Sequence, residues 1–141
     1  MAGQHDAQVA RADLVDLLTR ARRALVRDLG AVLEEEGFTV DQWRVLRALA
    51  SQERTMGDLA AAVEIPHPTL TRVVDALADS ALLYRSQSEQ DRRRVVVGVS
   101  ALGHTRLSRL EALATAHEQA LASRVGAENI AHLTDLLRTL P

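Results

Sequence analysis

Apolar residues recur at helical spacing in one long segment near the amino terminus and in two segments near the carboxyl terminus. From about Val9 to Leu33 this spacing persists for roughly seven turns, which predicts a long helix. The helix should stop at Glu36-Gly37, a typical helix-stop signal. A second long helix is predicted from about Ala101 to Ser123, capped by Ser100, and Gly126 separates it from a short final helix.

Three shorter helices are predicted between the two long ones. Two of them open on a capping box, in which a threonine is followed three residues later by a side chain that reaches back to the backbone: Thr39 with Gln42, and Thr55 with Asp58. The third follows a turn at residues 64–66 and has Pro68 in its first turn, where the missing N–H costs nothing.

The third of these helices has two chemically different faces. Its apolar stripe, which we expect to be buried, consists of Leu70, Val73, Val74 and Leu77. The opposite stripe is polar and carries Pro68, Arg72, Asp75 and Asp79, flanked by Thr69 and Thr71. A polar helix face of this kind is suited to a polar partner.

A short hairpin with an arginine-rich tip follows that helix. Two runs of β-branched or aromatic residues, Leu82 to Arg85 and Val95 to Val99, predict its strands. Between them lies Asp91-Arg92-Arg93-Arg94, and guanidinium forks suit phosphates and base edges. A polar helix face beside such a finger predicts a winged helix-turn-helix that binds DNA.

We interpret the arginine run as part of the hairpin strands, which sets the orientation of its side chains. In a strand, neighbouring side chains alternate between the two faces. Arg92 and Arg94 would then share one face, and Asp91 and Arg93 the other. Asp91 could thus orient Arg93. The alternative interpretation is a solvated charge patch with no binding role.

The composition is typical of one helical domain. The chain has 141 residues, 47% of them hydrophobic, and only three aromatic side chains, so the core must be aliphatic. Cysteine is absent, which excludes disulfides, thiolate metal sites and thiol redox sensing. Because no apolar run of about 18 residues and no basic-then-apolar leader occurs, we expect a soluble, cytoplasmic protein without membrane contact.

Charge is distributed unevenly along the chain. The formal net charge of −2 argues against histone-like coating of nucleic acid. All 17 basic residues are arginine, and four of them fall within ten positions: Arg85, Arg92, Arg93 and Arg94. Glu89 and Asp91 dilute this basic patch. We therefore expect sequence-selective binding of moderate strength.

Four short segments are specific in combination. They are Trp43-Arg44-Val45-Leu46, Thr71-Arg72-Val73-Val74-Asp75-Ala76-Leu77, Asp91-Arg92-Arg93 and Val99-Ser100-Ala101-Leu102-Gly103. Together they resemble the second helix, the recognition-helix core, the wing signature and the segment after the wing in the MarR family of transcriptional regulators. The sequence departs from that pattern in local turns, with Glu64 and Ala81 where many members have glycine and Pro66 where many have a capping serine.

The resemblance implies a mainly α fold with a small β-hairpin wing, in which a winged helix-turn-helix lobe joins a helical dimerisation region. We divide the single MarR-like domain, residues 1–141, into a DNA-binding lobe at 39–100 and dimerisation helices at 9–36 and 101–141. The family pattern implies an obligate homodimer whose first and last helices intertwine. The apolar pattern itself favours a dimer, because the lobe needs only part of the long helices for its core. The alternative is a monomer whose helices fold back on the lobe.

The expected DNA contacts come from the polar helix face and the hairpin tip: His67, Pro68, Thr69, Thr71, Arg72, Asp91, Arg92, Arg93 and Arg94. The family comparison makes Arg93 the candidate for the minor groove. The contacts expected on the helix have structural alternatives. Arg72 could be a solvated surface residue, the threonines could satisfy nearby carbonyls, and His67 could merely start the helix.

Three residues could line an effector pocket by resemblance to the family, in which small phenolic or carboxylate ligands lodge between the dimer helices and the lobe: Trp43, Arg44 and His117. Phe38 and Trp43 could instead belong to the core. The histidines His104, His117 and His132 show no i,i+4 pairing, so a metal site is not expected.

We interpret the chain as a homodimeric repressor of a nearby gene, released by a small aromatic or carboxylate effector, that binds a pseudo-palindromic operator in double-stranded DNA. The alternatives are a protein-binding winged-helix module and a metal-responsive regulator. No Gly-x-Ser-x-Gly elbow, phosphate loop or His-Glu-x-x-His helix occurs, so neither an enzyme nor a cofactor is expected.

Overall fold

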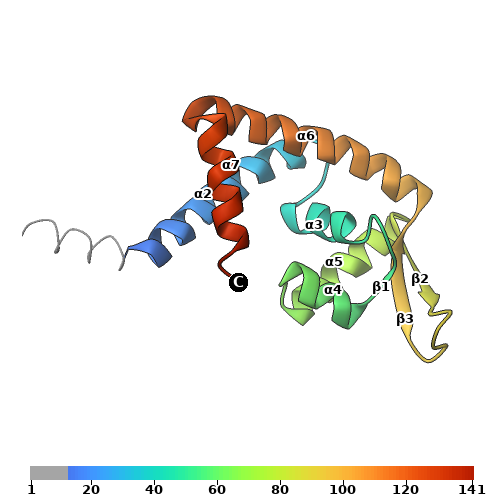
Figure 1. The fold of residues 1–141 in the computed structure, drawn as a ribbon. Helices are drawn as coiled ribbons and strands as arrows, with labels where there is room; N and C mark the ends of the chain where they lie inside the picture. Colours follow the sequence, from blue (N-terminus) through green and yellow to red (C-terminus); the bar gives the residue numbers. More distant parts are fainter. Residues whose placement is uncertain (1–12) are drawn as a thin grey trace, which may run out of the picture.

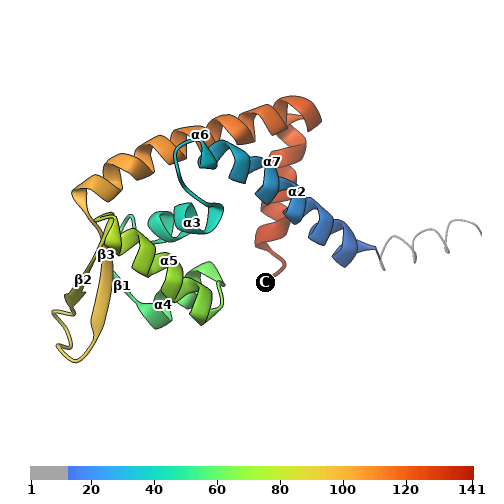
Figure 2. The same cartoon turned by 180° about the vertical axis from the view of Figure 1, so that it is seen from behind.

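The computed structural model describes residues 13–141 and places a helical arm above a smaller lobe (Figure 1). The arm consists of α2 (Leu14–Glu34), α6 (Ala101–Val125) and α7 (Ala127–Arg138). The lobe consists of α3 (Val40–Ala48), α4 (Met56–Val63), α5 (His67–Asp79), β1 (Arg54–Thr55), β2 (Leu83–Gln87) and β3 (Val95–Val99). Both views show α6 running from the strands at one end to α7 at the other (Figures 1 and 2). The predicted fold class is confirmed.

The helix boundaries follow local capping chemistry. The Thr39 hydroxyl accepts from the Gln42 backbone N–H at 3.1 Å, and the side-chain Oε1 of Gln42 accepts from the Thr39 backbone N–H at 3.0 Å, which confirms that capping box. At Thr55 only half of the predicted box is described, the hydroxyl accepting from the Asp58 N–H at 3.2 Å. The first predicted helix is confirmed from Leu14, and its residues 9–12 lie outside the described residues.

The predicted hairpin is confirmed as β2 and β3, and β1 adds a third strand, which gives an antiparallel sheet in the order β1-β3-β2. β2 pairs with β3 from Leu83 opposite Val99 to Gln87 opposite Val95. We call β2, β3 and the loop between them the wing. β1 pairs only Arg54 and Thr55 with the other edge of β3, and two residues are too few to show a periodic pattern.

One aliphatic cluster forms the core, and it lies inside the lobe. Its fully buried members come from every helix of the lobe, from β3, from α2 and from α6: Leu33, Val45, Leu46, Leu59, Leu70, Val74, Leu77, Val97 and Leu110. The arm therefore contributes to the core only where it passes the lobe. Farther out, apolar side chains are exposed on α2 and α7: Leu14, Val15, Leu17, Leu25, Leu133, Leu136 and Leu137.

The root of the wing is joined tightly to the start of α6. The Ser100 N–H donates to the Leu82 carbonyl at 3.0 Å, and the Ser100 hydroxyl donates to the Ala81 carbonyl at 2.6 Å. Gly103, in the first turn of α6, lies so close that a Cβ there would be 2.1 Å from the Leu82 carbonyl oxygen. Only glycine permits this approach of helix and strand.

Tyr84 closes the outer side of the sheet. Its ring covers Gly98, where a Cβ would lie 2.4 Å from the tyrosine hydroxyl oxygen. The hydroxyl donates to Glu53 Oε1 at 2.6 Å, and this hydrogen bond to a carboxylate raises the pKa of Tyr84 above its usual value.

Among residues 13–141, every helix is too short or too polar to cross a membrane.

Two non-glycine residues adopt the left-handed conformation on either side of α5. Glu64 has φ 53° at the end of α4, and Ala81 has φ 60° just after α5. These are the two positions at which the sequence departs from a glycine pattern, so the turns keep the geometry that glycine favours. Each residue bears the steric cost of its Cβ in that conformation.

We predict that Ala81→Gly stabilises the protein by up to about 1 kcal/mol, because glycine removes the steric cost at positive φ. The same change at Ala61, an exposed residue inside α4, should destabilise by about 0.5 to 1 kcal/mol. Denaturant unfolding of both variants measures the difference. Equal destabilisation by the two substitutions would show that Ala81 bears no such cost.

Candidate nucleic-acid interface

The recognition helix candidate, α5, presents the polar face that the sequence predicts. Leu70, Val74 and Leu77 are buried, and Val73 is half-buried. The residues proposed to contact DNA are all exposed: His67, Pro68, Thr69, Thr71 and Arg72. Pro66 caps the helix without a side-chain hydrogen bond, and Pro68 sits in its first turn. The amphipathic pattern therefore fixes which side of α5 faces solvent.

Thr71 already has a local partner. Its hydroxyl donates to the His67 carbonyl at 3.0 Å, one turn back in the helix. The Thr71 hydroxyl thus satisfies a nearby backbone carbonyl, as the structural alternative to a DNA contact predicts. A hydroxyl has one proton to donate, and phosphate oxygens only accept, so Thr71 could donate to a phosphate only by giving up this bond.

The tip of the wing is a turn and not a continuation of the strands. β2 ends at Gln87 and β3 begins at Val95, so the arginine run lies between them. The Asp91 carboxylate accepts from the Arg93 N–H at 3.0 Å, and the Asp91 carbonyl accepts from the Arg94 N–H at 3.0 Å. An aspartate that captures backbone N–H groups in this way closes a turn.

The prediction that Arg92 and Arg94 share one strand face while Asp91 and Arg93 share the other is therefore wrong. Its physical reason is that the side chain of Asp91 competes with strand pairing for the backbone donors. Asp91 acts on Arg93 through the backbone, so it shapes the tip without an ion pair to the guanidinium. All three arginines at the tip are exposed.

An ion pair links α5 to the wing. Arg85 on β2 donates from its terminal nitrogen to the Asp75 carboxylate on α5. The sequence pattern predicts Asp75 on the polar helix face and shows Arg85 only as part of a basic stretch. No local signal identifies the pair, because its members are ten positions apart on different elements.

The three residues expected at an effector pocket line one cavity of about 410 Å³ between the arm and α3. Trp43 is buried and His117 half-buried, whereas Arg44 donates to the Val63 carbonyl at 2.5 Å. Among the other polar residues that line this cavity, Glu111 and Arg47 interact with Trp43. Glu111 accepts from the Trp43 indole N–H at 3.2 Å, and the Arg47 guanidinium lies 3.6 Å from Glu111 and 5.3 Å from the centre of the indole ring.

Arg47 and Glu111 were missed because their role depends on a contact between α3 and α6. Trp43 and Glu111 are 68 positions apart, so no spacing rule connects them. Arg47 lies one turn after Trp43 and shares its helix face, which is the one signal that could have identified it.

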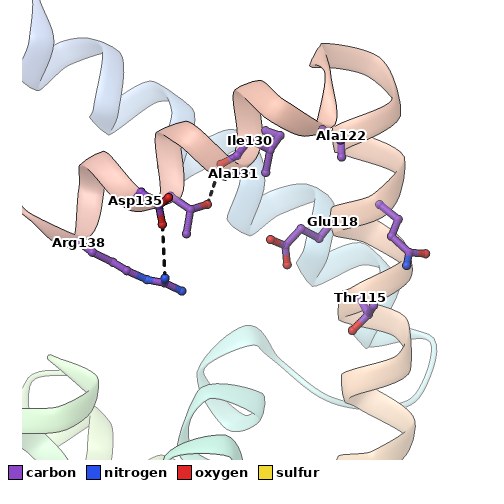
Figure 3. Close-up of a pocket in the computed structure, with 10 residues that line it drawn as sticks. Thr115, Glu118, Ala122, Ile130, Ala131, Asp135 and Arg138 are labelled. Carbon is purple, nitrogen blue, oxygen red and sulfur yellow. Dashed lines mark hydrogen bonds and ion pairs between the residues drawn. The ribbon is translucent and has the colours of Figure 1, made fainter.

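A second cavity, of about 420 Å³, opens between α6 and α7 near the end of the arm. Figure 3 shows Thr115, Glu118 and Ala122 of α6 facing Ile130, Ala131 and Asp135 of α7. Asp135 and Arg138 form an ion pair at 3.6 Å along α7. Within residues 13–141, no three histidine, aspartate or glutamate side chains converge to hold a metal ion.

Comparison with known proteins identifies the family. A family model described as MarR family matches residues 36–94. The HTH-type transcriptional regulator FarR of Neisseria gonorrhoeae is 29% identical over 124 residues, covering 87% of this chain and 85% of FarR. The solved structure of NadR in complex with 4-hydroxyphenylacetate is 30% identical, has a TM-score of 0.74, and is matched over 87% of this chain and 88% of NadR. The chain belongs to the MarR family.

A structure similar to this chain has also been solved with nucleic acid. The transcriptional repressor CouR, bound to a 23-mer DNA duplex, is 29% identical to this chain, with a TM-score of 0.83 over 90% of this chain and 91% of CouR. MarR-family proteins are DNA-binding transcriptional regulators and not enzymes. This chain is accordingly a DNA-binding regulator.

We predict that Asp91→Ala speeds hydrogen exchange of the Arg93 amide by roughly two- to tenfold, because a hydrogen bond of about 0.5 to 1.5 kcal/mol is lost. Asp91→Asn should keep the slow exchange, since its side-chain oxygen still accepts. Glu89→Ala removes a nearby charge without a described bond and serves as the control. Exchange at Arg93 that does not respond to Asp91→Ala would mean that the carboxylate does not hold the turn in solution.

Proposed function

We propose that this MarR-family protein is a homodimeric repressor that binds double-stranded DNA through α5 and the wing and is released by a small aromatic or carboxylate effector. One observation carries the proposal. The exposed polar face of α5 is joined by an ion pair to the wing, which carries an exposed arginine tip, in a fold shared with CouR, whose structure contains a DNA duplex.

In this proposal α5 enters the major groove and the wing tip reaches the adjacent minor groove. The contacts on α5 are His67, Pro68, Thr69, Thr71 and Arg72, and those on the wing are Asp91, Arg92, Arg93 and Arg94. Arg72 is the residue whose planar fork can read a base edge. The wing arginines suit a narrow minor groove, whose negative potential attracts guanidinium groups.

A symmetric dimer would explain the exposed apolar side chains of the arm. Leu14, Val15 and Leu17 on α2, together with Leu133 and Leu136 on α7, are about half exposed or more in one chain. Exposed apolar surface on two helices that line one cavity is typical of an interface. Two lobes related by a two-fold axis would read a pseudo-palindromic operator with half-sites about one helical turn apart.

The cavity between the arm and α3 is the proposed effector site. Trp43 and His117 offer aromatic contact, and Arg44 and Arg47 could pair with an acidic ligand in a lining that also holds Glu111 and Glu118. The NadR complex with 4-hydroxyphenylacetate supports this class of ligand. Because the cavity borders both arm and lobe, an effector that prefers another spacing of the two lobes would shift the dimer away from the DNA-binding geometry.

We predict that Leu17→Asp with Leu25→Asp abolishes dimer formation and DNA binding together, because burying unpaired carboxylates costs several kcal/mol. Light scattering measures the mass, and fluorescence anisotropy measures binding to a duplex selected by the wild-type protein from a random library. Gln52→Asp, an exposed change in the lobe, is the control. A double variant that stays dimeric would place the interface elsewhere.

We predict that Arg72→Ala weakens binding to the selected duplex by about 1 to 3 kcal/mol and relaxes the preference at one position of each half-site, if Arg72 reads a base. Competition among duplexes with single base changes measures the preference. Equal weakening for every duplex would indicate a phosphate contact. Unchanged affinity would remove Arg72 from the interface.

A further inference from the structure

The only described side-chain ion pair between α5 and the wing joins Asp75 and Arg85. Both side chains remain accessible, with 55% of Asp75 and 44% of Arg85 exposed. We propose that this is a positioning pair, which fixes the angle of the wing relative to α5 so that both elements engage DNA at once. The inference rests on the proposed function, in which α5 and the wing form one DNA-binding surface.

The outer wing needs such a support. Its root is held by the hydrogen bonds of the Ser100 N–H and hydroxyl, by buried Leu83, and by the buried β3 residues Val96, Val97 and Val99. From Tyr84 to Gln87 every residue of β2 is exposed, so no buried apolar contact holds this part of the strand against α5. β1 supports the sheet from the opposite edge, where it pairs with β3 at Val96 and Val97.

Arg85 stands on the part of β2 that has no buried side chain of its own. It is two residues beyond Leu83 and lies opposite Val97 in the middle of the β2-β3 register. Asp75 lies on the exposed face of α5, three residues after Arg72. The ion pair therefore connects the middle of the wing to the same helix face that we propose to enter the major groove.

The strength of the pair agrees with a positioning role better than with a role in folding. An exposed ion pair contributes at most about 1 kcal/mol, which corresponds to a factor of about five in an equilibrium constant. Such a factor changes the stability of a whole domain little. For the outer part of the wing, where β2 is exposed from Tyr84 to Gln87, the same factor changes the fraction of molecules in which tip and helix are aligned.

Limited proteolysis tests the pair without DNA. Trypsin cleaves after arginine, and the tip carries Arg92, Arg93 and Arg94 in a turn held by the wing. We expect Asp75→Ala and Arg85→Ala each to speed cleavage at the tip several-fold relative to cleavage after Arg138. Asp75→Glu and Arg85→Lys, which keep the charges, should cleave as the wild type does. Unchanged tip cleavage in both alanine variants would overturn the proposal.

The exchanged pair, Asp75→Arg with Arg85→Asp, separates positioning from direct contact with DNA. If the pair acts by holding the wing, each alanine variant should bind the selected duplex about two- to fivefold more weakly, and the double alanine variant no more weakly than either. The exchanged pair should recover both slow cleavage and affinity, whereas Asp75→Arg alone should not. Thermal midpoints close to the wild-type value would confirm that the fold is intact.

Two outcomes of the DNA measurement would overturn the proposal. Tighter binding by Asp75→Ala with a steeper dependence on salt would mean that Asp75 merely keeps Arg85 from a phosphate. Slow cleavage without recovered affinity in the exchanged pair would mean that these side chains contact DNA directly. A wild-type protein that selects no duplex would instead refute the proposed function, and the cleavage rates would still decide whether the pair holds the wing.

Discussion

The close contact between the first turn of α6 and the Leu82 carbonyl is the constraint on which the relation of arm and lobe depends. Gly103 allows the helix to approach the root of the wing. The Ser100 N–H donates to the Leu82 carbonyl, and the Ser100 hydroxyl donates to the Ala81 carbonyl. Farther along, Leu107 and Leu110 carry α6 into the core. At this end, arm and lobe move as one body, because any rotation of α6 displaces the strand to which it is bonded.

The other end of the lobe is joined differently. There α3 meets α6 through polar side chains, with the indole of Trp43 and the guanidinium of Arg47 both directed at Glu111, and a cavity of about 410 Å³ lies alongside. A polar contact beside a cavity can rearrange at lower cost than a close-packed apolar one. The structure thus combines a fixed attachment near the wing with an adaptable one near the proposed effector site.

The sequence predicts the features that depend on local chemistry. The helices are identified by their apolar spacing, and Thr39 and Ser100 mark their starts through side-chain caps. Strand propensity alone does not predict the turn at Asp91, because the side chain of that residue captures a backbone donor that a strand would use. The contacts of Arg85 with Asp75 and of Trp43 with Glu111 could not be predicted, since each joins elements whose separation in space no spacing rule encodes.

The position of Trp43 gives the protein an intrinsic optical probe. It is the one tryptophan in the chain, and its ring lies in the wall of the cavity beneath a guanidinium group and against a carboxylate. All indole emission therefore originates at the junction of arm and lobe. A molecule that enters the cavity, or a change in the contact of α3 with α6, alters the polarity around that single chromophore. The unlabelled protein can thus report spectroscopically on the part of the fold that we expect to change most.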